Sequence, residues 1–306
     1  MTRVYEASKR VSEASKPTRG YLSVSVGVAD ESSIPDQSVF ERYADETQTT
    51  GPGNSRSQND SNIFAPSTIT RPPSPLFSSL ALLPSARIHV PSKLLARGEI
   101  LPAQVQQYRR LAFALQELQD RSQWPGHSTV ERGLKTVLVT SALRREGKTL
   151  TVVNVAHALS HFLGRRVLVI DADLYNPSVH EMLGLPNSVG LSDFLSGAQD
   201  VPLMQVSPLM SVLPAGQGDP ARTGELTSDR MRALLDQCSA RFDWVLLDAP
   251  AVGLLRHPEQ LSRLVRSILL VIGSGSTPVR VIDEAISELG RGSIIGTVLN
   301  RVNGDR

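Results

Sequence analysis

The chain has 306 residues, 40% of them hydrophobic, and a formal net charge of only +2 at pH 7. This length is enough for one large domain or two ordinary ones, and the near-neutral charge gives no reason to expect nucleic acid as a partner. The single cysteine, Cys238, excludes an internal disulfide framework and fits a reducing, cytoplasmic compartment. No apolar run approaches the ~18 to 20 residues that cross a bilayer. The first thirty residues lack the apolar stretch of a secretion signal, so we expect any membrane association to come through a partner.

The first part of the chain has the composition of a disordered segment. Residues 51 to 80 contain seven Ser and five Pro and show no helical or strand period. Such a composition cannot bury enough apolar area to offset the entropy lost on ordering. We therefore expect residues 1 to 85 to be mostly disordered and residues 86 to 306 to form the folded domain.

A first helix is predicted over residues 103 to 120, where apolar side chains recur at helical spacing. The apolar positions are Val105, Tyr108, Leu111, Ala112, Leu115 and Leu118. The sequence RSQWPGHS then interrupts the pattern.

From residue 135 onward, short apolar runs alternate with helical stretches, one of which ends at Gly164 and another of which covers 278 to 290. Continuous Val, Ile and Leu runs are typical of strands buried on both faces. Strands that alternate with helices predict right-handed βαβ units, and hence an α/β fold with a mostly parallel sheet flanked by helices. The five runs lie at residues 135–141, 165–173, 242–250, 266–274 and 293–302.

Gly147-Lys148-Thr149 joins the first of these runs to the helix that follows it. Backbone N–H groups at the start of a helix, assisted by the helix dipole, bind anions. A lysine at this place can reach the outer phosphates of a nucleotide, and the Thr149 hydroxyl can ligate Mg²⁺. The complete pattern G-x-x-x-x-G-K-[ST] is matched in part, because Ala142 stands at its first glycine.

Carboxylates end two later apolar runs. Asp171 and Asp173 are two residues apart, so on an extended segment they project in the same direction, and Asp248 ends another run. Ligands of open α/β sheets bind at the carboxyl ends of the strands. Three acids there could hold Mg²⁺ and orient an attacking group beside the phosphate loop.

Other polar residues carry weaker signals. His157 and His161 are four residues apart on a predicted helix, a spacing that could bind zinc, but no third ligand is evident and we expect ordinary surface histidines. Asn300, at the end of the last apolar run, fits either a contact to a base edge or a role in a turn.

Six segments, in order along residues 103 to 303, resemble the bacterial tyrosine kinases of capsule and exopolysaccharide synthesis, which are deviant P-loop ATPases related to the Min/Par-type proteins. The combination is more specific than any one motif. The segments are TSALRREGKT, VLVIDADLYNPSVHEMLG, GLSDFLSG, VLPAGQGDPARTGEL, FDWVLLDAPAVG and GTVLNRV.

The resemblance implies a P-loop fold, ATP and Mg²⁺ as cofactors, and roles for individual residues. Asp171 and Asp173 correspond to the acids of the family's second Walker motif, Asp248 to the Walker B acid and Asn300 to an adenine contact. By this resemblance, Asp171 would activate the attacking hydroxyl and Asp248 would orient Mg²⁺ through water. The candidate catalytic residues are therefore Lys148, Asp171 and Asp173. The candidate metal site consists of Thr149, Asp171 and Asp248. The nucleotide contacts expected from the loop are Arg144, Arg145, Glu146, Gly147, Lys148, Thr149 and Leu150.

The chain departs from the family pattern in the phosphate loop and after the acids Asp171 and Asp173. Arg144 and Arg145 stand where the family usually has Pro-Gly, and Tyr175 stands where it usually has arginine. Glycine at such a position serves close backbone approach or a positive φ, whereas arginine brings a cationic fork suited to phosphate. Leu143 lacks the extra loop lysine of the Min/Par group.

Two further departures concern assembly and the phosphoacceptor. The family's oligomer-forming helix, E-x-x-R-x-x-R, is represented here by Gln106, Arg109 and Ala112, which predicts a monomer or a weak homo-oligomer. The sequence ends in NGDR without the family's tyrosine cluster, and its last tyrosine is Tyr175.

We interpret the chain as a cytoplasmic ATP-binding protein of exopolysaccharide or capsule synthesis and export. It would resemble the tyrosine autokinases, act with a membrane chain-length or export protein, and be recruited by that partner to the inner face of the membrane. The segments GLSDFLSG and VLPAG favour this interpretation. Two alternatives stay open: a Min/Par-type positioning ATPase, and a pseudokinase that binds its partner with little or no catalysis.

Overall fold

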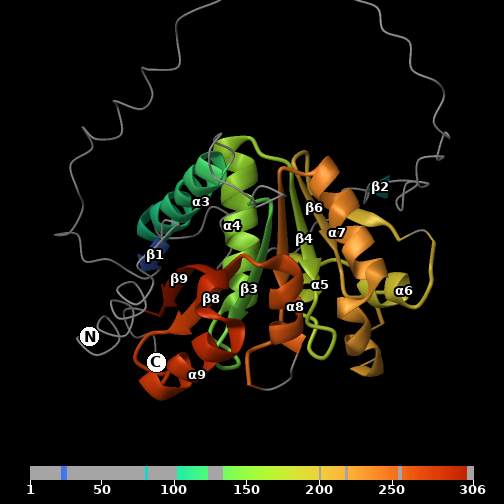
Figure 1. The fold of residues 1–306 in the computed structure, drawn as a ribbon. Helices are drawn as coiled ribbons and strands as arrows, with labels where there is room; N and C mark the ends of the chain where they lie inside the picture. Colours follow the sequence, from blue (N-terminus) through green and yellow to red (C-terminus); the bar gives the residue numbers. More distant parts are fainter. Residues whose placement is uncertain are drawn as a thin grey trace, which may run out of the picture. The chain divides into compact units, whose positions relative to one another are not determined.

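The computed structural model describes residues 22–25, 80–81, 102–122, 134–199, 201–217, 220–253 and 257–301. The described residues, drawn in colour in Figure 1, all belong to one of the two units into which the chain divides. The other unit, Ala29–Ser74, lies outside the described residues. So does most of the segment expected to be disordered, apart from two short strands that the sequence did not predict, β1 (Leu22–Ser25) and β2 (Leu80–Ala81).

A sheet with the strand order β1-β9-β8-β3-β7-β4-β6-β5-β2 forms the centre of this unit. All neighbouring strands are parallel except β5 and β6, which are antiparallel. The five predicted apolar runs form five adjacent strands of this sheet, which confirms the mostly parallel α/β fold. The remaining bounds are β3 (Thr136–Ser141), β4 (Val167–Asp171), β5 (Leu203–Ser207), β6 (Met210–Leu213), β7 (Trp244–Asp248), β8 (Ile268–Gly273) and β9 (Ile294–Asn300).

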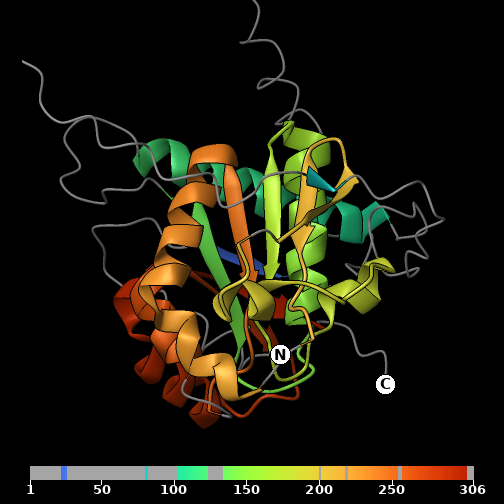
Figure 2. The same ribbon diagram turned by 90° about the vertical axis from the view of Figure 1, so that its right-hand side faces the viewer.

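Helices cover both faces of the sheet, which Figure 2 shows lying between α4 on one side and α7 on the other. One hydrophobic core packs α3, α4 and α5 against one face, and a second core packs the other four helices against the opposite face. The helices are α3 (Pro102–Ser122), α4 (Lys148–Leu163), α5 (Val179–Leu183), α6 (Leu191–Leu195), α7 (Asp229–Arg241), α8 (His257–Val265) and α9 (Val279–Leu289), with short 3₁₀ turns at Pro220–Thr227 and Arg291–Ser293.

Strand β3 shows why its sequence is apolar throughout. Successive side chains of a strand point to opposite faces, so Val137 and Val139 enter the core beneath α3 and α4, while Leu138 enters the other core. Each of these three residues is buried. A continuous apolar run is therefore needed to fill both cores, which is the physical basis of the strand predictions.

The predicted first helix is confirmed by α3 (Pro102–Ser122), and its apolar stripe lies against α4. The hairpin of β5 and β6 was missed, because polar residues such as Gln205 and Ser211 interrupt its apolar pattern. No helix in the described part of the chain has both the length and the apolarity needed to cross a membrane.

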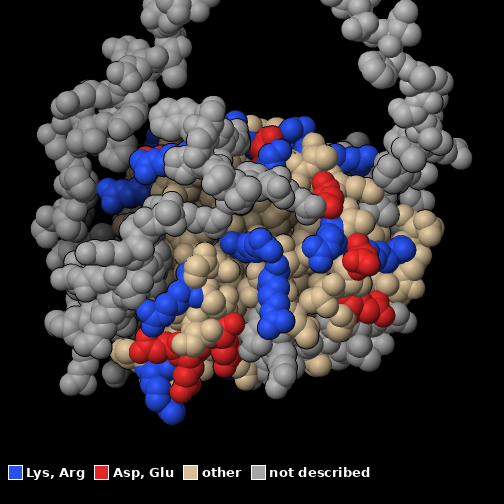
Figure 3. Space-filling model, viewed as in Figure 1, with Lys and Arg blue, Asp and Glu red and all other residues tan. Residues whose placement is uncertain are grey.

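Basic and acidic side chains are interspersed on the face of the molecule seen in Figure 3, in keeping with the near-neutral formal charge.

Candidate active site

The sheet topology brings the predicted chemical residues to one edge. Strands β3, β7 and β4 are adjacent and parallel, so the phosphate loop and the strand-end carboxylates leave the sheet at the same edge. Asp171 and Asp248 are direct register partners on β4 and β7. The order of these strands does not follow the order of the chain, so only the fold makes the acids neighbours.

The loop between β3 and α4 has two residues in the left-handed backbone region, Arg145 with φ 63° and Gly147 with φ 89°. A Cβ atom on Gly147 would lie 2.0 Å from Nδ2 of Asn300, so glycine is required there on two grounds. At Arg145 the family's usual glycine would adopt this conformation freely, whereas a residue with a Cβ is strained by about 1–2 kcal/mol. Both arginines, Arg144 and Arg145, are exposed at the pocket described below.

Glu146 points away from the pocket, which differs from its expected role as a nucleotide contact. Its Oε2 accepts a hydrogen bond from the N–H of Leu143 at 2.7 Å. Its Oε1 accepts from the N–H of Gly273 at 2.8 Å and from the Thr277 hydroxyl. The side chain is buried, and three donors compensate its charge. Glu146 therefore ties the loop to the end of β8, and only its backbone belongs to the nucleotide loop.

Asn300, the last residue of β9, forms a hydrogen bond to the same loop. Its Nδ2 donates to the carbonyl of Glu146 at 2.9 Å, and its Oδ1 accepts from the N–H of Arg301. Arg301 also donates to the carbonyl of Arg145 at 2.6 Å. The side chain of Asn300 thus has a structural role at this loop, and the adenine contact stays a prediction.

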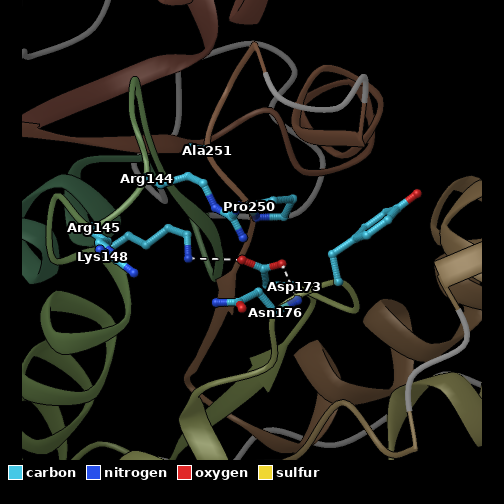
Figure 4. Close-up of a pocket in the computed structure, with 8 residues that line it drawn as sticks. Arg144, Arg145, Lys148, Asp173, Asn176, Pro250 and Ala251 are labelled. Carbon is cyan, nitrogen blue, oxygen red and sulfur yellow. Dashed lines mark hydrogen bonds and ion pairs between the residues drawn. The ribbon is translucent and has the colours of Figure 1, made fainter.

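Lys148 and Asp173 both line a pocket of about 550 Å³, where they form an ion pair with their Nζ and Oδ2 atoms 3.0 Å apart (Figure 4). Burial alone would lower the pKa of Lys148, but the charges of Asp248, Asp173 and Asp171 raise it above its ordinary value. The lysine is therefore a fixed cation at the pocket. The complete lining is Arg144, Arg145, Lys148, Asp173, Tyr175, Asn176, Pro250 and Ala251.

Thr149 and Asp248 form a buried pair behind the lysine. The Thr149 hydroxyl donates to Asp248 Oδ2 at 2.6 Å and lies 2.9 Å from the Ser178 hydroxyl oxygen. Asp248 Oδ1 is buried without a hydrogen-bond partner. Burial raises the pKa of Asp248 to about 6, and Lys148 and Thr149 oppose this rise.

This arrangement fits a magnesium ion that is held partly through water. The unpartnered oxygen of Asp248 can accept a hydrogen bond from a metal-bound water, and such a group needs an explanation in a native structure. Among the described residues no group of three His, Cys, Asp or Glu side chains is placed to hold a metal. Mg²⁺ would then rely on the Thr149 hydroxyl, phosphate oxygens and water, a ligand set that this ion prefers.

Asp171 does not line the pocket, contrary to the expectation that it meets the attacking hydroxyl. The residue is 0% exposed. Its Oδ1 accepts from the N–H of Asp173, and its Oδ2 accepts from the N–H groups of Ser178 and Val179, both at 3.0 Å. Burial, followed by the charge of Asp248, raises the pKa of Asp171 to about 8. Asp171 therefore shapes the loop after β4, and Asp173 is the acid that faces the pocket.

The other candidates have simpler environments. The side chain of Leu150 packs against the core beneath α4, so only its backbone is left for the predicted nucleotide contact. His157 and His161 stack on each other with ring centroids 5.2 Å apart, as half-buried and exposed helix residues.

Sequence reasoning missed Asn176, Pro250 and Ala251 as pocket residues. A usable signal existed, because each of them lies two or three positions after one of the strand-end acids, Asp173 or Asp248.

Comparisons with known proteins support the fold. No family model matches the chain. It is 31% identical over 178 residues to the tyrosine-protein kinase YwqD of Bacillus subtilis (strain 168), and the match covers 56% of this chain and 75% of YwqD. The chain belongs to the bacterial tyrosine-protein kinase family. The resemblance identified from the sequence motifs is therefore confirmed.

One solved kinase domain and one further relative extend this finding. The kinase domain of the Escherichia coli tyrosine kinase ETK superimposes with a TM-score of 0.56 at 25% identity, covering 65% of this chain and 75% of that domain. The succinoglycan biosynthesis transport protein ExoP of Rhizobium meliloti (strain 1021) is 28% identical over 177 residues, covering 55% of this chain. The match spans only 22% of ExoP, so the whole-protein activity of ExoP does not transfer to this chain.

Proposed function

We propose that the protein is an ATP- and Mg²⁺-dependent, tyrosine-autokinase-like protein of exopolysaccharide or capsule synthesis and export. The observation that carries the proposal is the ion pair of Lys148 and Asp173 at the pocket, 3.0 Å long, beside the hydrogen bond from Thr149 to Asp248. A phosphate-binding cation, a carboxylate and a metal-ligating hydroxyl are thus assembled within one site.

The positive groups of the site suit a triphosphate. Lys148 presents a charged ammonium, and Arg144 and Arg145 add guanidinium groups at the pocket. The N-terminus of α4 adds free backbone N–H groups, since the first turn of a helix has no intrahelical acceptors for them. Bound Mg²⁺ would supply further charge compensation beside Thr149.

Asp173 is the carboxylate that we assign to the acceptor hydroxyl. Its Oδ2 contacts Lys148, its Oδ1 accepts from the N–H of Asn176 at 3.1 Å, and it lines the pocket. In the transfer, the phenolic oxygen bonds to the γ-phosphorus, the bond to the β,γ-bridging oxygen breaks, and ADP leaves. The phenolic proton passes to Asp173. When Lys148 turns to the phosphates, Asp173 is released from its ion pair to accept that proton.

Membership of the bacterial tyrosine-protein kinase family supports a proposal for the partner and the compartment. We place the protein in the cytoplasm, at the inner face of the membrane, where it would act with a membrane chain-length or export protein. The similarity to ExoP, a succinoglycan biosynthesis transport protein, supports such a pathway.

Weak self-association is part of the proposal. At the family's oligomer motif, Ala112 is buried, and Arg109 stacks over the rings of Phe113 and Phe162 with its guanidinium 5.6 Å from each centroid. The one remaining charge of the motif is thus already engaged within the chain. Light scattering at micromolar concentration should give a mass near that of the monomer.

Replacement of the loop lysine tests the nucleotide site. Lys148→Ala should weaken ATP binding about tenfold or more, because a hydrogen bond to a charged group contributes roughly 1.5–3 kcal/mol. Lys135, the residue just before β3, provides the matched control, because its Nζ donates to the carbonyl of Ser239. Lys135→Ala should bind ATP as the wild type does in calorimetry. Equal ATP affinity of the wild type and Lys148→Ala would contradict the proposal.

A catalytically weak pseudokinase is the second candidate, favoured by the burial of Asp171. It predicts ATP binding without phosphotyrosine after incubation with ATP and Mg²⁺. Leu143 contributes no charge at the place of the Min/Par loop lysine, and no feature of the described residues favours a positioning ATPase over these two functions.

A further inference from the structure

Ser178 occupies the position before α5 where a serine normally caps the helix, yet its hydroxyl makes no capping bond. Asp171 performs that task instead, because its Oδ2 accepts from the N–H groups of Ser178 and Val179. The backbone of Ser178 is therefore held in place by a buried carboxylate, and its hydroxyl is available for a different contact.

That contact is with Thr149, whose hydroxyl oxygen lies 2.9 Å from the hydroxyl oxygen of Ser178. Thr149 has one hydroxyl hydrogen, and it donates this hydrogen to Asp248 Oδ2 at 2.6 Å. Ser178 must then be the donor in the pair with Thr149. The Thr149 oxygen uses one lone pair for Ser178 and keeps the other for a further ligand.

We propose that Ser178 is a positioning residue for the metal-ligating hydroxyl of Thr149. Asp248 and Ser178 hold the Thr149 hydroxyl from two sides, so its remaining lone pair has a defined direction before Mg²⁺ arrives. The inference rests on the proposed function, since it requires that Mg²⁺ and a nucleotide bind together at this loop.

The sequence around Ser178 does not reveal its proposed role in positioning Thr149. A serine before a short helix has the ordinary explanation of a helix cap, and seven residues separate it from Asp171. Thr149 and Ser178 become neighbours only because α4 follows β3 and α5 follows β4, two parallel strands on either side of β7, so both helices begin at the carboxyl edge of the sheet.

The test is the Mg²⁺ dependence of ADP affinity, measured by calorimetry on the full chain with ADP as the probe. For Ser178→Ala, the Mg²⁺ concentration that gives half of the gain in ADP affinity should rise about two- to tenfold, the effect expected from losing one hydrogen bond. Its ADP affinity in EDTA should stay within about twofold of the wild type. Ser178→Thr restores a hydroxyl and should return the Mg²⁺ dependence toward the wild-type value.

Ser287 provides the matched control, because its hydroxyl donates to the carbonyl of Asp283 on an exposed part of α9. Ser287→Ala should leave both measurements unchanged. Thermal unfolding in EDTA should be cooperative for Ser178→Ala, Ser178→Thr and Ser287→Ala, and Ser178→Ala should show at most the small decrease in Tm expected from one lost hydrogen bond. An equal loss of ADP affinity with and without Mg²⁺ in Ser178→Ala would assign the serine a purely structural role and overturn the inference.

The remaining outcomes separate this inference from the function on which it rests. A Ser178→Ala variant with wild-type Mg²⁺ dependence contradicts the role of Ser178 alone. A wild-type protein whose ADP affinity does not respond to Mg²⁺ overturns both the inference and the metal dependence of the proposed function. If Lys148→Ala binds the nucleotide as tightly as the wild type, this result contradicts the proposed function without testing the role of Ser178.

Discussion

The side-chain amide of Asn300 lies where a side chain on Gly147 would begin, with Nδ2 only 2.0 Å from the place of a Cβ atom. Asn300 also donates to the carbonyl of Glu146, so the end of β9 fixes the phosphate loop by contact and by hydrogen bond. The close approach demands glycine at the residue before the loop lysine for a reason that lies outside the loop.

This relationship predicts unequal effects of two substitutions. Gly147→Ala should destabilise the protein by more than about 1 kcal/mol and weaken ADP binding at least about tenfold, because it combines a positive φ with the clash. Asn300→Ala should cost only about 0.5–1.5 kcal/mol, the net contribution of a hydrogen bond. In the double variant the clash is gone but the positive φ persists, so stability should recover only in part. Full recovery in urea unfolding would show that the backbone conformation costs nothing.

Arg145→Gly should raise stability and lower nucleotide affinity at the same time. Glycine adopts the left-handed conformation of residue 145 without strain, which should stabilise the fold by about 0.5–1 kcal/mol. Loss of the guanidinium should weaken ADP binding about three- to tenfold.

Arg266→Gly is the matched control, since Arg266 also has a positive φ of 57° but follows α8 and is not among the residues that line the pocket. It should gain stability with ADP affinity unchanged. If Arg145→Gly binds ADP as tightly as the wild type, the loop arginine has no part in phosphate binding.

Asp248→Asn should change how stability depends on pH in the absence of Mg²⁺. Burial raises the pKa of Asp248 to about 6, so its contribution to stability is fully present below the unfolded-state value and is lost as pH rises through 6. Asparagine keeps an oxygen for Thr149 and carries no charge. The variant should be more stable than the wild type above pH 6, by of the order of 1–3 kcal/mol, and the difference should vanish near pH 4. Urea unfolding across this range measures the effect.

Asp243 supplies a control of opposite sign. Its hydrogen bonds from Arg166 lower its pKa below the ordinary value, so its stabilisation is present above the unfolded-state pKa and lost as pH falls through the folded one. Asp243→Asn should therefore be less stable than the wild type at neutral pH. An Asp248→Asn protein that also loses stability at pH 8 would refute the buried-charge explanation.

Autophosphorylation, if the kinase is active, should fall on Tyr5, Tyr21 or Tyr43, which lie outside the described residues, and not on Tyr108 or Tyr175. Tyr108 is 3% exposed, and burial raises its pKa. Its hydroxyl cannot reach a neighbouring site without unfolding α3. Tyr175 lines the pocket of its own chain. Incubation with ATP and Mg²⁺ followed by peptide mass spectrometry decides between the positions.

Tyr108→Phe is the control for this prediction, since it should leave the level of phosphotyrosine unchanged. Phosphate found on Tyr108 or Tyr175 alone would overturn the assignment to the first part of the chain.

Much of the fold follows from local patterns in the sequence. The strand that ends at Asp171 and the strand that ends at Asp248 are apolar throughout, because each fills two cores, and this pattern is visible without any structure. The β5–β6 hairpin escaped prediction, since its strands are short and carry polar residues such as Gln205. The phosphate loop was identifiable because Gly147-Lys148-Thr149 needs only local geometry, a strand followed by a helix.

The sequence by itself therefore determined the fold class, the family and the set of charged residues at the strand ends. Only the tertiary structure decided the direction of each side chain. Asp171 turns inward to hold Ser178 and Val179, Asp173 faces Lys148, and Glu146 ties the loop to β8. The physical reason is that a buried carboxylate must find donors, and the donors that are available depend on which segments the sheet order places beside it.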